Sequence, residues 1–353
     1  MKIAGCETHA VRVTYEGSVS GLHVVLRLRT DAGIEGVSYV SRISPQTIKP
    51  LVLLIEGNVG QLSGADPLNA EALYARLFRS VNPLLGAPAG LEARAASAVE
   101  AALWDIRGKA LGQPVFRLMG GFRDRVPVSA NWGLQPGPSP DALAASAQEH
   151  LRRGFRALKF QLGQLEPDAA VNHIRTIREA VGKDVKLIVD ANQRWTAKQA
   201  VKVGKAIAPY EPYWIEDPVP HHDYAGLRQV KDSLATLVCA GEVYQSVPQF
   251  RTLLEQRCAD VAMVDLDLGL SGFLRVAHMA EAYGVPLVNH LASEILAHAI
   301  AAVPNGLIVG FYPWAQPLFA EPARIEDGEL VLSEEPGLGL ELDEVALRRF
   351  ALA

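Results

Sequence analysis

Six ionisable side chains stand at the ends of six successive apolar stretches of this chain, 23 to 31 residues apart. A strand with its crossover helix needs about 30 residues, so the spacing predicts one polar group at the carboxyl end of each strand in a series of βα units. In a (β/α)₈ barrel these strand ends open on one face, and that face carries the active site. The side chains predicted to meet there are Lys159, Asp190, Glu216, Glu242, Asp265 and His290.

Three of these groups are carboxylates on consecutive predicted strands, Asp190, Glu216 and Glu242. Like charges that face one point repel one another unless a cation neutralises them. Oxygen ligands favour a hard divalent ion. Mg²⁺, which keeps positions for water or substrate oxygens, fits best, and Mn²⁺ is the alternative. Each carboxylate alone is more simply explained as a helix N-cap or an ion-pair partner, so the prediction of a metal site rests on the three together.

The hydrophobic pattern predicts the elements that position these groups. From Val126 onward, eight short apolar runs alternate with helical segments, as expected for parallel strands buried on both faces. Residues 1 to about 45 are rich in strand formers. Helices are predicted at 45–57, 67–80 and 91–111.

These elements divide the chain into three predicted segments. An α+β unit spans 1–125, a barrel spans 126–318, and a C-terminal segment at 319–353 returns to the first unit. A small-residue loop is expected at 15–21 and a hairpin at 323–332. The total of 353 residues fits a barrel of about 250 residues with a second domain.

Composition and charge narrow the classes of function. The net charge of −5 argues against nucleic acid or an anionic membrane as a partner. Three scattered cysteines, Cys6, Cys239 and Cys258, do not suggest a disulfide framework, and no apolar signal segment opens the chain. These features predict a cytoplasmic protein. No apolar run approaches the 18 residues of a transmembrane helix.

With these residues in place, the chain resembles the enolase superfamily, specifically its mandelate racemase-like members. The similarity covers nearly the whole chain and rests on motifs that are specific in combination. They are 154–161 (GFRALKFQ), 190–193 (DANQ), 214–218 (WIEDP), 240–242 (AGE), Asp265, 289–291 (NHL), 102–105 (ALWD) and 118–121 (LMGG).

The resemblance implies a (β/α)₇β barrel, a modified TIM barrel, with an N-terminal α+β capping domain that the C-terminal segment completes. It implies Mg²⁺ held by Asp190, Glu216 and Glu242. It also implies removal of the proton α to a substrate carboxylate, giving an enediolate that the metal stabilises. His290 is the implied base, and Asp265 fixes its tautomer and raises its basicity.

Two positions depart from the family pattern. The Lys-x-Lys of the second strand is Lys159-Phe160-Gln161 here. Lys159 therefore remains an electrostatic partner of the substrate, while the usual second base is replaced by an amide that cannot accept a proton. Where mandelate racemase has a Glu on the eighth strand that hydrogen-bonds the substrate carboxylate, this chain has Gly310. Both departures weaken a two-base racemase.

A single histidine can complete a dehydration. His290 would take the α-proton and then return a proton to the departing β-hydroxyl, giving an enol that becomes a 2-keto acid. We therefore expect a Mg²⁺-dependent lyase of the acid-sugar dehydratase type, acting on a small carboxylic acid. The alternatives are a racemase or epimerase that uses Lys159 or water on the other face, and a catalytically idle ligand-binding barrel.

Several polar side chains near the strand ends are candidates for contacts with substrate hydroxyls, namely Asn131, Gln161, Asn192 and Asn289. Trp132, which ends the first barrel strand, is a candidate for lining the pocket, and simple packing is the competing explanation. Specificity is expected in capping-domain loops, chiefly at 15–21. The family also suggests a symmetric homo-oligomer.

Overall fold

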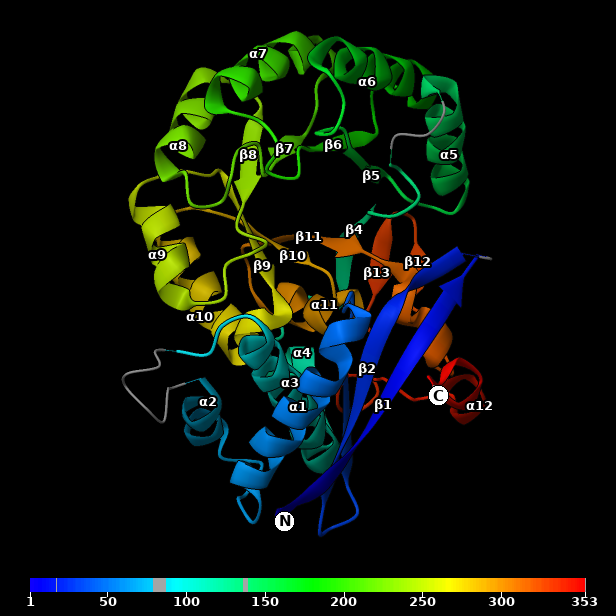
Figure 1. Ribbon diagram of the computed structural model, residues 1–353, viewed down its shortest axis with the longest axis vertical. Coiled ribbons are helices and arrows are strands. Elements are labelled where there is room, and N and C mark those ends of the chain that lie inside the picture. The colour runs from blue at the N-terminus through cyan, green and yellow to red at the C-terminus, as the bar shows by residue number, and fades with distance from the viewer. Residues whose placement is uncertain (17, 79–86, 136–138, 353) are drawn as a thin grey trace.

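The computed structural model describes residues 1–16, 18–78, 87–135 and 139–352 (Figure 1). The N-terminal segment contains an antiparallel sheet of β1 (Ile3–Tyr15), β2 (Ser18–Thr30) and β3 (Glu35–Val40). The expected loop at 15–21 is wrong, because Val19 and Gly21 already pair with β1 and only two residues separate the strands.

Helices follow the sheet in the chain. They are η1 (Pro45–Thr47), α1 (Ile48–Leu62), α2 (Ala70–Phe78), α3 (Leu91–Leu111) and α4 (Val115–Met119). Of these, α1 and α3 pack against the sheet. The first predicted helix extends five residues further than expected, to Leu62. The second begins at Ala70 rather than at 67, because the Asp66 side chain accepts the Leu68 N–H in a turn that precedes it. Its predicted end at residue 80 lies outside the described residues. The long helix has the predicted bounds and ends at Gly112, whose φ of 63° suits a left-handed C-cap.

Eight parallel strands form a closed barrel, because β11 pairs with β4 as well as with β10. The strands are β4 (Arg125–Ala130), β5 (Ala157–Gln161), β6 (Lys186–Asp190), β7 (Trp214–Glu216), β8 (Leu237–Ala240), β9 (Val261–Asp265), β10 (Leu287–His290) and β11 (Gly306–Phe311). The predicted barrel is confirmed.

Seven helices connect these strands, giving the predicted (β/α)₇β order. They are α5 (Pro140–Arg152), α6 (Pro167–Val181), α7 (Ala197–Ile207), α8 (Tyr224–Ser233), α9 (Val247–Glu255), α10 (Gly269–Ala282) and α11 (Ser293–Ala302). Short η2 (Ala208–Tyr210) and η3 (Leu266–Leu268) adjoin them. Figure 1 shows α5 to α10 as an arc around the strands, with the N-terminal helices and sheet on the other side.

The side-chain alternation of the strands fills the barrel in layers. A separate apolar cluster contains one or two residues from each of seven strands: Ala157, Ile188, Trp214, Cys239, Val261, Met263, Val288 and Ile308. Because successive residues of a strand point to opposite faces, the residue two positions after Ala157, Ile188, Trp214, Met263 or Val288 also points to the interior. Those residues are Lys159, Asp190, Glu216, Asp265 and His290. These apolar side chains therefore form a layer that fills the barrel interior below its polar end.

The C-terminal segment contacts both parts of the chain. After η4 (Pro313–Leu318), the predicted hairpin forms as β12 (Arg324–Glu326) and β13 (Glu329–Val331), and β13 pairs with β4 of the barrel. The segment then reaches the N-terminal sheet, where α12 (Glu344–Phe350) precedes a hydrogen bond from Leu352 N–H to the Ala10 carbonyl, 2.9 Å long. The division into domains at 125/126 and 318/319 remains a prediction.

Candidate active site

Strand register brings the predicted catalytic groups together in the barrel. Gln161, Asp190 and Glu216 are paired neighbours on β5, β6 and β7. Asp265 and His290 are paired neighbours on β9 and β10. Asp190 and Glu216 are at most 1% exposed. These strand ends form a group of charges at one end of the barrel, which we call the strand-end cluster. Its members are Lys159, Asp190, Glu216, Glu242, Asp265 and His290.

The Lys159 ammonium lies between two of the carboxylates. Its Nζ is 2.5 Å from Glu216 Oε1 and 3.4 Å from Asp190 Oδ2. Burial alone would lower the pKa of Lys159, but Glu216, the Tyr312 phenol and Asp190 outweigh burial and hold this pKa well above its usual value. Lys159 is therefore a permanent cation in this arrangement.

Burial and neighbouring charges shift the pKa values of the carboxylates. Burial, together with the nearby charges of Asp190 and Glu242, raises the pKa of Glu216 to about 7 despite the Lys159 ammonium. Burial also raises the pKa of Asp190. Glu242 differs. Burial would raise its pKa, but His290, Lys159 and, further away, Arg42 outweigh burial and lower it.

His290 and Asp265 form a hydrogen-bonded pair. The ring Nδ1 is 2.6 Å from Asp265 Oδ2, and the other carboxylate oxygen accepts the Leu266 N–H at 2.6 Å. An Asp that accepts from Nδ1–H leaves Nε2 for proton transfer, and Nε2 faces Glu242 Oε2 at 3.3 Å. Burial would lower the pKa of His290, but Glu242 and Asp265 outweigh burial and raise it.

The charge balance of the strand-end cluster fits a divalent cation. Lys159 supplies one positive charge, and His290 a second when it is protonated, against four carboxylates, Asp190, Glu216, Glu242 and Asp265. Two negative charges remain, and all donors are hard oxygens. In the described part of the chain, no three acidic, histidine or cysteine side chains converge tightly enough to hold an ion, because Lys159 lies between two of the acids and Glu242 pairs with His290. The metal ligand set therefore remains a prediction.

Asp217 is a member of this cluster that the sequence reasoning did not assign. Burial and then Glu242, Glu216 and Asp190 raise its pKa well above the usual value. The protonated carboxyl group hydrogen-bonds Glu242, so Asp217 orients that carboxylate. The signal was present in the sequence as the acid that follows Glu216 in WIEDP.

Tyr312 is a second unassigned residue at the site. It follows β11 and is 5% exposed. Its ring lies 6.0 Å from the His290 ring and 5.6 Å from Lys159 Nζ, and its hydroxyl hydrogen-bonds Lys159. Burial raises the pKa of Tyr312 to about 12, so the phenol is neutral. Its oxygen accepts from the Lys159 ammonium, and its O–H is left to donate. No motif in the sequence marked it.

The side chains predicted to contact the substrate differ in their hydrogen-bond partners within the protein. Gln161 is half-buried beside Asp190, and no hydrogen bond of its side chain occurs among the described residues, so its amide is free for a ligand. Asn192 instead positions Asp190. Its backbone N–H and its Nδ2 donate to the two carboxylate oxygens at 2.8 and 2.9 Å.

Asn131 explains the glycine on the eighth strand. A Cβ atom added at Gly310 would lie 2.6 Å from Asn131 Nδ2. The Asn131 side chain, whose Oδ1 accepts from Ser129 Oγ at 2.8 Å, therefore fills the space of a strand-eight side chain. The amide that follows β4 therefore occupies the space beside Gly310, the position at which the family resemblance leads us to expect an acid.

Trp132 and Asn289 have structural roles in this fold. Trp132 packs edge-on against His150 and Phe155, at ring distances of 4.4 and 5.3 Å, outside the polar end of the barrel. Asn289 Nδ2 donates to the Gly310 carbonyl, and its Oδ1 accepts the Gly310 N–H at 2.8 Å. These geometries show packing for Trp132 and strand pairing for Asn289, and the predicted substrate contacts stay predictions.

Strained backbone conformations occur at the ends of three catalytic strands. Five of the ten non-glycine residues with positive φ in the described part of the chain follow β6, β7 and β10. They are Asn192, Gln193, Asp217, Leu291 and Ala292, with φ between 36° and 60°. Such conformations cost of order 1–3 kcal/mol each and gather at functional sites. The strain is consistent with turns that aim Asp190, Glu216 and His290 inward.

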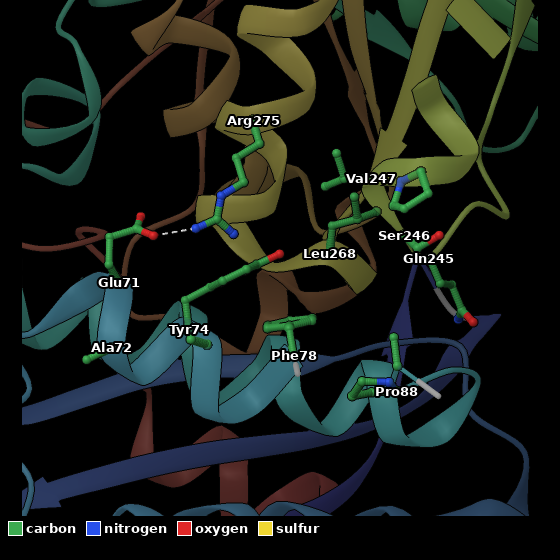
Figure 2. Close-up of a pocket in the computed structure, with 13 residues that line it drawn as sticks. Glu71, Ala72, Tyr74, Phe78, Pro88, Gln245, Ser246, Val247, Leu268 and Arg275 are labelled. Atoms are coloured by element: carbon green, nitrogen blue, oxygen red, sulfur yellow. Dashed lines mark hydrogen bonds and ion pairs between the residues drawn. The ribbon is translucent and has the colours of Figure 1, made fainter. Parts of the chain in front are cut away.

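The structure also contains a cavity away from the strand ends. It occupies about 650 Å³ between α2 and the α9–α10 region. Figure 2 shows Arg275 reaching across it to Glu71 above the Tyr74 ring. Its lining contains no residue of the strand-end cluster, and its two charges neutralise each other. The chain between Phe78 and Ala87, at its edge, lies outside the described residues. The chemistry therefore places the candidate active site at the strand ends.

Comparison with known proteins identifies the family. Residues 142–346 match the model described as "Enolase C-terminal domain-like". Residues 7–120 match the model for the N-terminal domain of mandelate racemase and muconate lactonizing enzyme. Together the two matches span both the N-terminal segment and the barrel.

Similar proteins carry names of acid-sugar enzymes. L-Talarate/galactarate dehydratase of Salmonella typhimurium is 29% identical over 92% of this chain and 81% of its own length. D-Xylonate dehydratase of Haloferax volcanii is 30% identical, over 91% and 83%. The solved L-talarate dehydratase from Polaromonas sp. JS666, complexed with Mg and L-glucarate, is 26% identical with a TM-score of 0.91, covering 100% of this chain and 98% of its own. The chain belongs to the mandelate racemase/muconate lactonizing enzyme-like enzymes of the enolase superfamily.

Proposed function

We propose that this protein is a Mg²⁺-dependent dehydratase that converts an acid sugar or a related hydroxy acid to a 2-keto acid. The observation that carries the proposal is the His290–Asp265 pair, 2.6 Å apart, facing the carboxylate cluster with Gln161 in place of a second base. The names of the similar dehydratases support the same class of reaction.

The residues of this chain perform the proton transfers. His290 Nε2 takes the proton from the carbon next to the substrate carboxylate, while Asp265 holds Nδ1–H and stabilises the resulting imidazolium. The Cβ–O bond then breaks, and the same imidazolium donates a proton to the departing hydroxyl, which leaves as water. The enol product tautomerises to the 2-keto acid.

The developing negative charge requires stabilisation beyond the base. A general base contributes about 10²–10⁴ in rate, so electrostatic terms carry most of the barrier reduction. The Lys159 ammonium, the Tyr312 hydroxyl and the Asn131 amide are the cation and donors beside the carboxylate position. Asp190, Glu216 and Glu242 would hold Mg²⁺, which when bound supplies a Lewis acid at the substrate carboxylate.

Racemisation is the less supported reaction. It needs a base on each face of the α-carbon, and Gln161 cannot accept a proton. Lys159 is held as a cation by Glu216 and Asp190, so it is a poor substitute.

A panel of aldonic and aldaric acids tests the proposal. The protein is incubated with each acid and Mg²⁺ in D₂O, 2-keto acid is measured, and α-proton exchange is followed by NMR. We expect 2-keto acid from at least one acid, and no product after chelation of the metal or in His290→Asn. Racemisation of an α-substituted acid without loss of a hydroxyl, and no 2-keto acid from the whole panel, would overturn it.

The partner proposed for this chain is the small carboxylic acid itself. No helix in the described part of the chain has the length and hydropathy of a membrane span. A symmetric homo-oligomer remains a prediction.

A further inference from the structure

Arg42 is an exposed cation of the N-terminal segment that contacts the chain just after the last barrel strand. It follows β3 and has a φ of 52°. Its guanidinium lies 5.1 Å from the centre of the Trp314 ring in η4. Stacking on Trp leaves the N–H groups at the edge of the guanidinium plane available for hydrogen bonds.

A chain of aromatic contacts connects Arg42 to the catalytic pair. The Trp314 ring lies 4.7 Å from the Tyr312 ring, and the Tyr312 ring lies 6.0 Å from the His290 ring.

The backbone before Arg42 is fixed against the barrel. Arg94 Nη2 donates to the Ser41 carbonyl at 2.8 Å, and Arg94 Nε lies 3.5 Å from Asp267 Oδ1. Ser41 also lines a water-sized cavity of about 20 Å³ together with Asp265 and others. These contacts hold the Arg42 loop beside the end of β9.

Arg42 has no acidic partner in the described part of the chain. Arg94 is paired with Asp267 and Lys159 with Glu216, whereas no carboxylate among the described residues lies within ion-pair distance of Arg42. A guanidinium with free donors matches a carboxylate in charge and geometry. Lys159 is already shared between Asp190 and Glu216, so a substrate with a second carboxylate needs another cation.

We propose that Arg42 determines specificity by binding the distal carboxylate of a dicarboxylic substrate, so that an aldaric acid is preferred to the matching aldonic acid. This inference rests on the proposed function for the identity of the site. It adds the substrate class, because an aldarate and an aldonate of one configuration differ only at the terminal carbon that Arg42 would contact.

The test compares matched substrate pairs, galactarate with galactonate and glucarate with gluconate. Arg42→Met keeps a long apolar side chain on Trp314 and removes the charge. We expect kcat/KM to fall about 10- to 100-fold for the aldarate, the range of a charged hydrogen-bonded pair, and less than two-fold for the aldonate. Arg42→Lys, which keeps the charge without the planar fork, should give an intermediate loss for the aldarate.

Arg349→Met is the matched control, because Arg349 is also exposed and stacked, 5.3 Å from the Phe350 ring of α12. Arg349→Met should leave kcat/KM unchanged for both the aldarate and the aldonate. If Arg42→Met lowers kcat/KM equally for both acids, and most at low salt, Arg42 only steers anions and the inference is overturned. No effect on either acid overturns it as well.

A binding measurement separates this inference from the proposed reaction. Calorimetry with Mg²⁺ in a His290→Asn background measures the affinity for galactarate and glucarate without turnover. If no acid is dehydrated but Arg42→Met still weakens aldarate binding 10- to 100-fold, the reaction fails and the Arg42 inference stands. If 2-keto acid forms and Arg42→Met weakens both members of a pair alike, the reaction stands and the inference fails.

Discussion

Two regions of this molecule bury carboxylates, and they surround them differently. In the seam where α3 meets the barrel and the C-terminal segment, Glu100 accepts from Trp104 Nε1 at 2.8 Å, Leu270 N–H at 2.8 Å and the Ser271 N–H and hydroxyl. Asp105 accepts from Val37 N–H, Leu338 N–H and Lys109, each at 2.7 Å. We call this set the α3 seam.

The strand-end cluster has few such fixed donors. Glu216 is held by Lys159 and by Trp214 Nε1, and Glu242 by His290 and the Asp217 carboxyl. The main neighbours of these acids are other titratable groups. A buried carboxylate saturated by backbone N–H groups joins segments of the fold, whereas one crowded by other charges marks chemistry.

The histidines of α11 and of β10 repeat this contrast. His298 in α11 accepts the Phe116 N–H at Nδ1 and donates from Nε2 to the Leu338 carbonyl, at 3.2 and 3.1 Å. Burial lowers its pKa to about 4, whereas the pKa of His290, eight residues earlier, is raised by Glu242 and Asp265 against the effect of burial. The surroundings of His298 therefore favour its neutral form, whereas the acids beside His290 favour binding of a proton.

The largest expected effect is at His290. His290→Asn should lower 2-keto acid formation by about 10⁴-fold, because one group acts as both base and acid. The unfolding free energy should change by less than about 1 kcal/mol, since the Asn amide can still donate to Asp265. Turnover assays with urea denaturation check both values. A large loss of stability would erase the contrast with the α3 seam.

Glu100→Ala should show the opposite profile. It removes the acceptor of several buried donors, which costs about 3–5 kcal/mol, while turnover per folded molecule stays within two-fold. Urea denaturation measures the loss. Glu92→Ala, on the exposed first turn of the same helix, is the control and should cost less than about 1 kcal/mol. Equal losses in the two variants would contradict a structural role for the seam.

His298 predicts how stability depends on pH. Its folded pKa of about 4 lies below the ordinary value of 6.5, so between these values the unfolded chain binds the proton. Its contribution to stability is therefore complete above pH 6.5 and is lost as the pH falls toward 4, up to about 3 kcal/mol.

Denaturation midpoints from pH 4 to 7 measure this slope. His298→Gln, which cannot be protonated, should be less stable at pH 7 and should show a flatter profile below pH 6.5. Parallel profiles for the wild type and the variant would show that His298 is not held neutral by the fold.

Tyr312→Phe should have the smallest effect. It removes the hydroxyl that hydrogen-bonds Lys159 and keeps the ring against His290 and Trp314. One neutral hydrogen bond is worth about 0.5–1.5 kcal/mol, so kcat should fall about 3- to 10-fold with the denaturation midpoint unchanged. An unchanged kcat would place Tyr312 in packing alone.

Much of the site was predictable because side chains along a strand point alternately to its two faces, so the sequence position of a residue indicates which face it is on. The six polar residues end apolar runs at the spacing of βα units, and five of them extend the alternation of interior residues such as Ile188 and Val288. Strand formation and alternation are local properties. The barrel, its order of elements and the convergence of its strand ends follow from them.

Other features depended on contacts between segments that no local pattern connects. Tyr312 lies at the site because β11 closes the barrel against β4, and Asn131 fills the space at Gly310 for the same reason. Asn192 and Trp132 were assigned to the substrate by position. The structure adds a hydrogen bond from the Asn192 amide to Asp190 and a contact of Trp132 with His150, and the substrate contacts of both stay predictions. The loop predicted at 15–21 failed because strand pairing with β1 overrode its small-residue composition.

The sequence by itself determined the barrel and the strand-end acids, since hydrophobic period and residue type act over a few neighbouring positions. The family resemblance supplied the pairing of His290 with Asp265. Only the tertiary structure decided which acid is paired with which cation, that Asp217 supports Glu242, and that Arg42 stacks on Trp314. Burial, ion pairing and pKa depend on distances between residues far apart in the chain, and those distances exist only once the chain is folded.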